Sequence, residues 1–118
     1  MKIGITSQNF RTITGHAGRT RRFLIYEVKP GSDEIRELER LDLPRKMAMH
    51  AYRGTDPHPI EALDILITGG CGQGFMNRLG MSGVRVYVTG EEDPLSAVRR
   101  LLAGEPLPPP APHDHTPH

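Results

Sequence analysis

A glycine-rich segment around a single cysteine carries the clearest chemical signal in this sequence. Gly69, Gly70, Gly72 and Gly74 surround Cys71, directly after an apolar run and shortly before a predicted helix. Glycines let backbone N–H groups approach an anion, and a helix N-terminus adds the positive end of its dipole. The spacing matches neither the dinucleotide motif GxGxxG nor a Walker A loop. The segment therefore predicts either an anion-binding turn of another kind or a tight strand-to-helix turn without a ligand.

Cys71 is the only cysteine, so no disulfide can form within the chain, and a reducing compartment fits best. A cysteine near a helix N-terminus has a lowered pKa, so we expect Cys71 to have thiolate character. Thiolate is the usual protein ligand for iron in iron–sulfur clusters. The alternative is a small buried residue without a chemical role. Cys71 is therefore a candidate metal ligand.

Three histidines in predicted loops extend the set of candidate metal ligands. His16 is followed closely by a glycine and preceded by another, and His50 and His58 lie in the long loop before the glycine-rich segment. Neither an HxxxH nor a CxxC spacing is present, which argues against a closed structural zinc site. A metal site would have to be assembled across the fold from these histidines and Cys71. Each histidine could also be solvated and without a ligand.

The last residues of the chain differ in composition from the rest. Residues 105–118 are rich in proline and histidine and cannot bury much apolar surface. We expect this tail to be extended and mobile, and residues 1–104 to form a single domain. The tail histidines, His113, His115 and His118, could bind metal weakly as an accessory site or could be incidental.

Motifs of catalysis are missing from the sequence. We find neither a GxSxG nucleophile elbow nor a group of carboxylates at the predicted strand ends. Asp64 opens a strand instead of closing it, and Glu91, Glu92 and Asp93 are typical of a helix start. A nuclease or a nucleotide-dependent transferase would need carboxylates that hold a divalent metal. The sequence therefore predicts a protein that is not an enzyme.

The candidate residues need a scaffold of strands to bring them together. Alternation and apolar runs predict strands at residues 2–6, 22–29, 35–43, 63–68 and 84–89. A turn with proline and glycine joins the second and third of these strands as an antiparallel hairpin. A helix remains an alternative for the stretch after that turn, because apolar residues recur there at every third position.

Two helices follow the glycine-rich segment and the last strand. The first is expected at residues 75–81. The second begins with Asp93 as its cap and Pro94 in its first position, and it ends at Gly104. Its expected buried stripe consists of Leu95, Val98, Leu101 and Leu102. The strand–helix–strand crossover makes the last two strands parallel, so the sequence predicts a mixed sheet with helices packed on it.

Charge and hydropathy limit the classes of partner. The formal net charge is +1 with neutral histidines, which demands neither nucleic acid nor a membrane surface. The basic cluster of Arg19, Arg21 and Arg22 is interpreted as a solvated strand edge. The longest apolar runs are far too short to span a bilayer, and the N-terminus has no apolar segment typical of a signal peptide. We therefore expect a cytoplasmic protein.

Four segments of the chain, taken in order, match motifs of a known family. They are the opening strand with GHAGR at residues 15–19, FLIYEV at residues 23–28, the run at residues 63–75 that ends in GQGF, and residues 84–98, which end in EDPLSAV. Together they resemble the dinitrogenase iron–molybdenum cofactor biosynthesis family, to which NifX, NafY-like domains and the C-terminal domain of NifB belong. The resemblance covers about residues 1–104.

The resemblance implies a ribonuclease H-like α/β fold with a mixed five-stranded sheet flanked by helices and without nuclease activity. It also implies carriage or insertion of iron–molybdenum cofactor precursors during nitrogenase maturation, with His16 at the family's cluster-binding loop histidine. Two departures stand out, because Ala17 replaces the usual phenylalanine and Cys71 replaces another small or apolar residue. The context of His50 and His58 resembles a subgroup pattern, which favours both facing the site.

We therefore expect a carrier of an iron–sulfur-based cluster, namely the iron–molybdenum cofactor or its precursor. Cys71 and His16 lead the ligand set, His50 and His58 are second choices, and the anionic cluster would rest on the amides of residues 70–74. The expected partners are cofactor-assembly or recipient proteins of nitrogenase type, with the chain a monomer or a homodimer. The alternatives are a cofactor-free regulatory module and, less favoured, a nucleotide- or nucleic-acid-processing enzyme.

Overall fold

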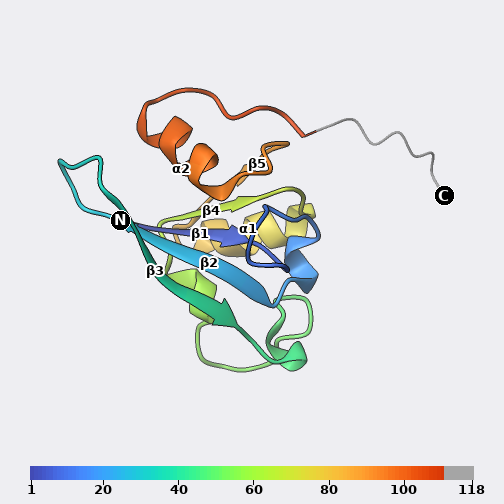
Figure 1. The fold of residues 1–118 in the computed structure, drawn as a ribbon. Helices are drawn as coiled ribbons and strands as arrows, with labels where there is room; N and C mark the ends of the chain where they lie inside the picture. Colours follow the sequence, from blue (N-terminus) through green and yellow to red (C-terminus); the bar gives the residue numbers. More distant parts are fainter. Residues whose placement is uncertain (111–118) are drawn as a thin grey trace.

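Five strands form one mixed sheet in the order β3-β2-β1-β4-β5 (Figure 1). The structure, a computed structural model, describes residues 1–110. The strands are β1 (Lys2–Thr6), β2 (Arg22–Val28), β3 (Ile35–Asp42), β4 (Ile65–Thr68) and β5 (Arg85–Val88). β2 runs antiparallel to both β1 and β3, whereas β4 runs parallel to both β1 and β5. The expected single α/β domain with a mixed five-stranded sheet is confirmed.

Two α-helices cover opposite faces of the sheet. The helical elements are α1 (Gln73–Met81), α2 (Pro94–Leu102) and three short 3₁₀ turns, η1 (Ala17–Arg19), η2 (Arg45–Met47) and η3 (Pro59–Ala62). Leu79 of α1 packs in an apolar cluster that contains Phe23, whereas Val98 of α2 packs in a cluster that contains Leu24. Because Phe23 and Leu24 are neighbours in β2, they face opposite sides of the sheet. The two helices therefore bury both faces of its centre.

The ends of the second helix follow its capping residues. Asp93 accepts a hydrogen bond from the Ser96 backbone N–H at 2.8 Å, and Pro94 stands at the first helical position, as expected. Gly104 ends the helix with φ of 74°. The expected buried stripe is wrong in one position, because Leu95 is exposed. Ala97 is buried in its place, since α2 is rotated to bring this smaller side chain against the sheet.

The helical alternative for residues 34–41 is wrong, because this segment is the edge strand β3. Its charged side chains are exposed, and its two arginines form ion pairs on the surface, Arg36 with Glu27 of β2 and Arg40 with Glu37 of β3 itself. Charged side chains are typical of edge strands, because they discourage pairing with another chain.

Of residues 1–110, no helix is long and apolar enough to cross a membrane.

The first residues of the predicted tail are held against the domain. Residues 105–110 form neither helix nor strand, as expected. Leu107, however, packs on the apolar cluster beneath α2, and the Pro108 carbonyl accepts hydrogen bonds from Thr89 Oγ1 at 2.6 Å and the Gly90 N–H at 3.1 Å. The chain therefore does not leave the domain at Gly104. The tail histidines lie outside the described residues.

A cluster of buried threonines joins the ends of β1 and β4. Thr6 and Thr68 are fully buried, and their hydroxyl oxygens lie 2.8 Å apart. The Thr6 hydroxyl also reaches the Thr14 carbonyl at 2.6 Å, and the Thr14 carbonyl accepts from the Gly69 N–H at 3.0 Å. The next residue of the loop after β4 is bonded as well, because the Gly70 carbonyl accepts a hydrogen bond from the Ala17 N–H at 3.0 Å. The loops after β1 and β4 are thereby fastened to each other.

We predict that Thr68→Val lowers the free energy of unfolding by about 1–3 kcal/mol, because valine keeps the shape but leaves buried polar partners without their hydrogen bonds. The comparison is the urea midpoint of the variant with that of the wild type. The same change at the exposed Thr55 is the control and is expected to shift stability by less than about 0.5 kcal/mol. Equal losses at both positions would show that the cluster does not stabilise the loops.

Candidate functional site

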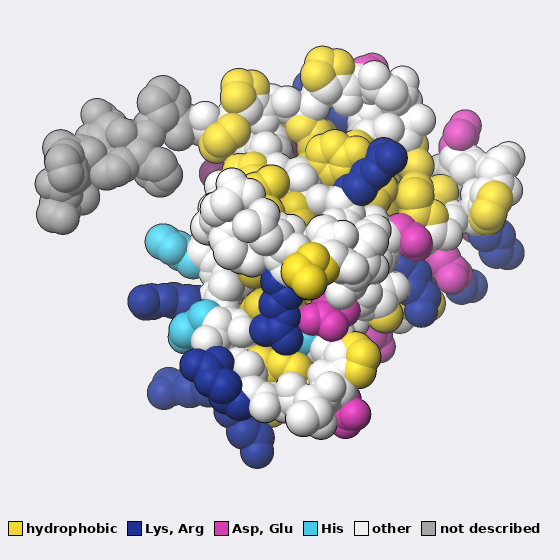
Figure 2. Space-filling model, turned by 180° about the vertical axis from the view of Figure 1, so that it is seen from behind, with side chains coloured by type: hydrophobic (Ala, Val, Ile, Leu, Met, Phe, Trp, Pro, Cys, Tyr) yellow, Lys and Arg dark blue, Asp and Glu magenta, His cyan; other side chains and the backbone are white. Residues whose placement is uncertain are grey.

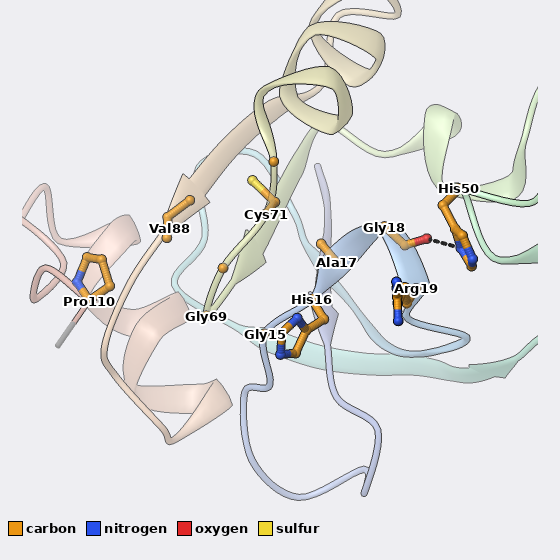
Figure 3. A pocket seen from close by; sticks show the side chains of 12 residues that line it. Gly15, His16, Ala17, Gly18, Arg19, His50, Gly69, Cys71, Val88 and Pro110 are labelled. Atoms are coloured by element: carbon orange, nitrogen blue, oxygen red, sulfur yellow. Dashed lines mark hydrogen bonds between the residues drawn. The ribbon is translucent and has the colours of Figure 1, made fainter. Parts of the chain in front are cut away.

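A hollow of about 730 Å³ lies at the carboxyl ends of β1, β4 and β5 (Figure 3). In open α/β sheets this edge is where ligands bind, because the loops that leave parallel strands diverge there. The hollow is lined by the loop after β1, the glycine-rich segment after β4, the end of β5, one residue of the loop after η2, and the start of the tail. The residues are Gly15, His16, Ala17, Gly18, Arg19, His50, Gly69, Gly70, Cys71, Gly72, Val88 and Pro110.

His16 stands at the rim of the hollow in a strained backbone conformation. It is exposed, with φ of 54° and ψ of 49°, in the left-handed region that few residues other than glycine adopt. The hydrogen bonds of Thr14 and Ala17 to the loop after β4 hold the chain on either side of it. Among residues 1–110, its imidazole caps no backbone N–H of η1. Strain of this kind is concentrated at functional sites, which supports a role for His16.

Cys71 lies in the hollow, but its surroundings favour the protonated thiol more than we expected. It is half-buried and packs on the apolar cluster beneath α1, and this burial raises the pKa of its thiol. The predicted lowering of the pKa is therefore wrong. The N-cap of α1 is Gly72, so Cys71 precedes the helix, and desolvation by burial is the cause of the raised pKa. In Figure 3 its sulfur points away from the His16 ring.

His50 lines the same hollow with one ring nitrogen already engaged. Its Nδ1 lies 2.9 Å from the Gly18 carbonyl oxygen, and its backbone N–H donates to the same oxygen at 2.8 Å (Figure 3). A carbonyl can only accept, so Nδ1 carries the proton and the lone pair of Nε2 is left for another partner. Metal-binding histidines are commonly oriented by this kind of bond from the other ring nitrogen. His50 therefore has the tautomer of a ligand.

His58 does not belong to the site. It is buried, its Nε2 donates to the Met47 carbonyl, and its Nδ1 accepts from the Ile60 N–H at 3.2 Å. With Glu61 it forms a capping box at the start of η3. The prediction that His58 faces the site is wrong, because both of its ring nitrogens are used to hold the loop together. Burial lowers the pKa of His58, which keeps the ring neutral.

The four glycines of the segment after β4 differ in whether they line the hollow and in how closely they approach the loop after β1. Gly70 and Gly72 line the hollow as expected, whereas Gly74 lies inside the first turn of α1 and does not. A Cβ on Gly69 would come within 3.3 Å of the backbone of Thr14 and Gly15. The close approach of the loops therefore favours glycine at position 69, since a larger residue would push the two loops apart by a few tenths of an ångström. The contact of Gly69 with the loop after β1 could not be predicted from the sequence, because that loop is over 50 residues away along the chain.

The hollow is electrostatically suited to an anion. Arg19 and the two imidazoles line it, and within residues 1–110 no Asp or Glu does. Arg19 was expected on a solvated strand edge. It lies instead in η1, at the wall of the hollow. A complete metal site is not preformed, because no three His, Cys, Asp or Glu side chains in the described chain lie where they could hold a metal ion.

Fold and site together define a class of small α/β domains with an open, glycine-lined hollow that bears imidazole and thiol groups. The chain belongs to the dinitrogenase iron–molybdenum cofactor family, whose model matches residues 1–104. The resemblance seen in the sequence is therefore confirmed. Membership indicates a role in nitrogenase cofactor maturation. No curated protein matches the chain.

Two solved structures share the fold. The crystal structure of PH0822 has a TM-score of 0.67 and 19% sequence identity, and the match covers 95% of this chain and 97% of that one. The NMR structure of TM1290, a Thermotoga protein described as a candidate NifB protein of the DUF35 family, has a TM-score of 0.60 and 20% identity, with coverage of 87% and 88%. At these identities the two structures establish the fold alone.

We predict that His58 makes the stability of the domain fall in acid. The unfolded chain binds a proton at this residue near pH 6.5, whereas the folded chain does so only at lower pH, so stability present above about pH 6.5 is lost below it. Urea midpoints between pH 8 and pH 5 should fall in the wild type and vary less in His58→Gln. The exposed His50→Gln is the control and should keep the fall. An identical pH profile in all three proteins would contradict the assignment.

We predict that Cys71 is alkylated by iodoacetamide more slowly at pH 7 than the cysteine of a free peptide of residues 69–74. The reason is that burial raises the pKa of the thiol and only the thiolate reacts. The rate profile of the folded protein should have its midpoint at higher pH than the peptide's. In urea the two rates should become equal. A faster reaction in the folded protein would mean that the helix dipole dominates after all.

Proposed function

We propose that the hollow carries an iron–sulfur-based cluster, the iron–molybdenum cofactor or a precursor of it, as cargo during nitrogenase cofactor maturation. The observation that carries the proposal is the composition of the hollow, in which thiol, imidazole and guanidinium groups meet glycine backbone and to which residues 1–110 contribute no carboxylate. Soft sulfur and nitrogen ligands suit iron, and the absence of competing carboxylates suits an anionic cargo. The proposal is a carrier on a ribonuclease H-like fold, and not an enzyme.

The ligands differ in how far they are prepared for a cluster. His50 is oriented by Gly18 and offers Nε2, and His16 stands free at the rim. Cys71 must first lose the proton that burial favours, and coordination to a metal supplies the driving force for that loss. The N-terminus of α1 adds unpaired backbone N–H groups beside the hollow. Loading through Cys71 is therefore expected to release a proton.

An incomplete set of ligands suits a carrier. A resident metal is held by a full set of protein ligands in most structural sites. Among residues 1–110, no three donors converge on one point of the open hollow, so a cargo bound there would keep ligand positions for its next host.

We predict that the protein retains iron after anaerobic incubation with iron and sulfide, or with isolated iron–molybdenum cofactor, followed by desalting. Iron, molybdenum and sulfide per chain and the visible spectrum are measured. The double variant His16→Ala, Cys71→Ser should lose most of the retained iron, because it loses the free imidazole and the thiolate. A chain ending at Pro110 should load like the wild type and so exclude the tail histidines as the main site.

His16→Gly is the control for folding in this experiment. Glycine adopts the left-handed conformation without the penalty of about 1–2 kcal/mol that other residues incur, so this variant should be at least as stable as the wild type. Loss of loading in His16→Gly would then report on the imidazole alone. Retention of cluster by the double variant would contradict the site, and no retention by the wild type would favour the cofactor-free module.

A further inference from the structure

Four cations lie on the segments that meet at His50, and one of them, Arg19, lines the hollow. We call Arg19, Arg45, Lys46 and Arg53 the basic rim. In Figure 2, Lys and Arg side chains gather beside histidine side chains along one edge of the molecule. All four are exposed, and in the part of the chain that the structure describes none of them forms a salt bridge. A net charge of only +1 therefore hides a local excess of positive charge.

Backbone hydrogen bonds hold the segments of the basic rim together. Arg19 belongs to η1, Arg45 and Lys46 belong to η2, and Arg53 lies in the following loop. His50 connects them, because its N–H and ring reach the Gly18 carbonyl and its own carbonyl accepts from Arg53 Nη1 at 3.2 Å. The rim is thus part of the same construction that orients His50 in the hollow.

The cations of the basic rim are distinct because they lie on segments joined at His50 beside the hollow, whereas other cations of residues 1–110 without a salt bridge, such as Lys2 and Arg85, lie at the amino ends of β1 and β5. Two further cations are paired within the domain. Arg78 pairs with Glu61 at 3.1 Å, and Arg22 pairs with Asp42 at 3.4 Å. These neighbouring cations are neutralised within the domain. The rim is left with positive charge that a partner can meet, and such charge steers association and sets orientation more than it adds affinity.

We propose that the basic rim docks an acidic surface of the protein that receives the cluster, so that the recipient's site faces the hollow. This inference rests on the proposed function. Arg19 belongs to both the rim and the wall of the hollow, so a partner bound at the rim lies over its mouth. Docking by charge also leaves the apolar core undisturbed while the cargo moves.

A protein partner fits the rim better than a membrane or a nucleic acid. The large hydrophobic residues exposed in residues 1–110, Met1, Leu38, Met81 and Leu95, belong to none of the rim's segments, so an apolar anchor for a membrane is missing there. The aromatic residue nearest in sequence, Tyr52, is half-buried, and the Arg78 guanidinium lies over its ring at 5.7 Å from the centroid, so that face is not open for stacking a base.

The test uses Arg45→Glu, Lys46→Glu, which changes the rim at two residues that do not line the hollow. The matched control is Lys2→Glu, Arg85→Glu. Both residues are exposed and stand at the amino ends of β1 and β5, whereas the hollow lies at the carboxyl ends of these strands. Each protein is loaded with iron–molybdenum cofactor, and transfer to cofactor-free dinitrogenase is timed at about 50 mM and about 300 mM salt. Binding of the unloaded proteins to the same acceptor, to duplex DNA and to anionic vesicles is measured alongside.

We expect the rim variant to load like the wild type but to transfer about tenfold more slowly at low salt, with little further effect of salt. The control pair should behave like the wild type. Wild-type transfer rates in the rim variant, loss of loading in that variant, or rim-dependent binding to DNA or vesicles instead of the acceptor would each overturn the proposal. If the wild type loads no cluster, only the proposed function is contradicted. The docking proposal is then tested by whether the unloaded rim variant binds the acceptor more weakly than the unloaded wild type does.

Discussion

The threonine cluster at the ends of β1 and β4 is the constraint on which the rest of the site depends. Thr6 and Thr68 are buried where two parallel strands end and their ladder of hydrogen bonds stops. Their hydroxyl groups bond to the backbone of both loops, at the Thr14 and Gly70 carbonyls and at the Gly70 N–H. The loop after β1 is thereby held against the glycine-rich segment, which gives the hollow two of its walls. The left-handed backbone of His16 and the preference for glycine at position 69 both follow from this attachment.

Burial divides the four candidate ligands into two kinds. His58 is buried with both ring nitrogens hydrogen-bonded, so it stabilises a loop. In His50 only Nδ1 is bonded within residues 1–110, to the Gly18 carbonyl, and Nε2 is left for another partner. Cys71 lies between these cases, because apolar neighbours favour its protonated form but leave it at the wall of the hollow. A site in which coordination competes with desolvation binds reversibly, which is the property that a carrier of a metal cluster needs.

Much of the fold could be predicted from local patterns. The strands and helices were expected within a few residues of their observed bounds, because alternation, β-branched runs, the Asp93 cap and the terminal glycines act over short stretches. The errors arose where distant groups decide. Leu95 is exposed since the rotation of α2 depends on the sheet beneath it, and Leu107 is packed because the apolar surface that receives it comes from other elements. The pKa of Cys71 was misjudged because burial cannot be read from a loop sequence.

By itself, the sequence determined the type of four of the five strands and of both α-helices, the family and the set of chemically capable residues, since these depend on residue type, order and short-range spacing. His16, His50 and Cys71 were all among the expected ligands. Tertiary structure alone decided which of them share a hollow, which ring nitrogen of His50 is free, and that His58 is enclosed in the core. It also gathered the basic rim from segments about 25 residues apart. Contacts of this range are set by strand order and by the pairing of loop backbones, and neither leaves a mark in the local spacing of residues.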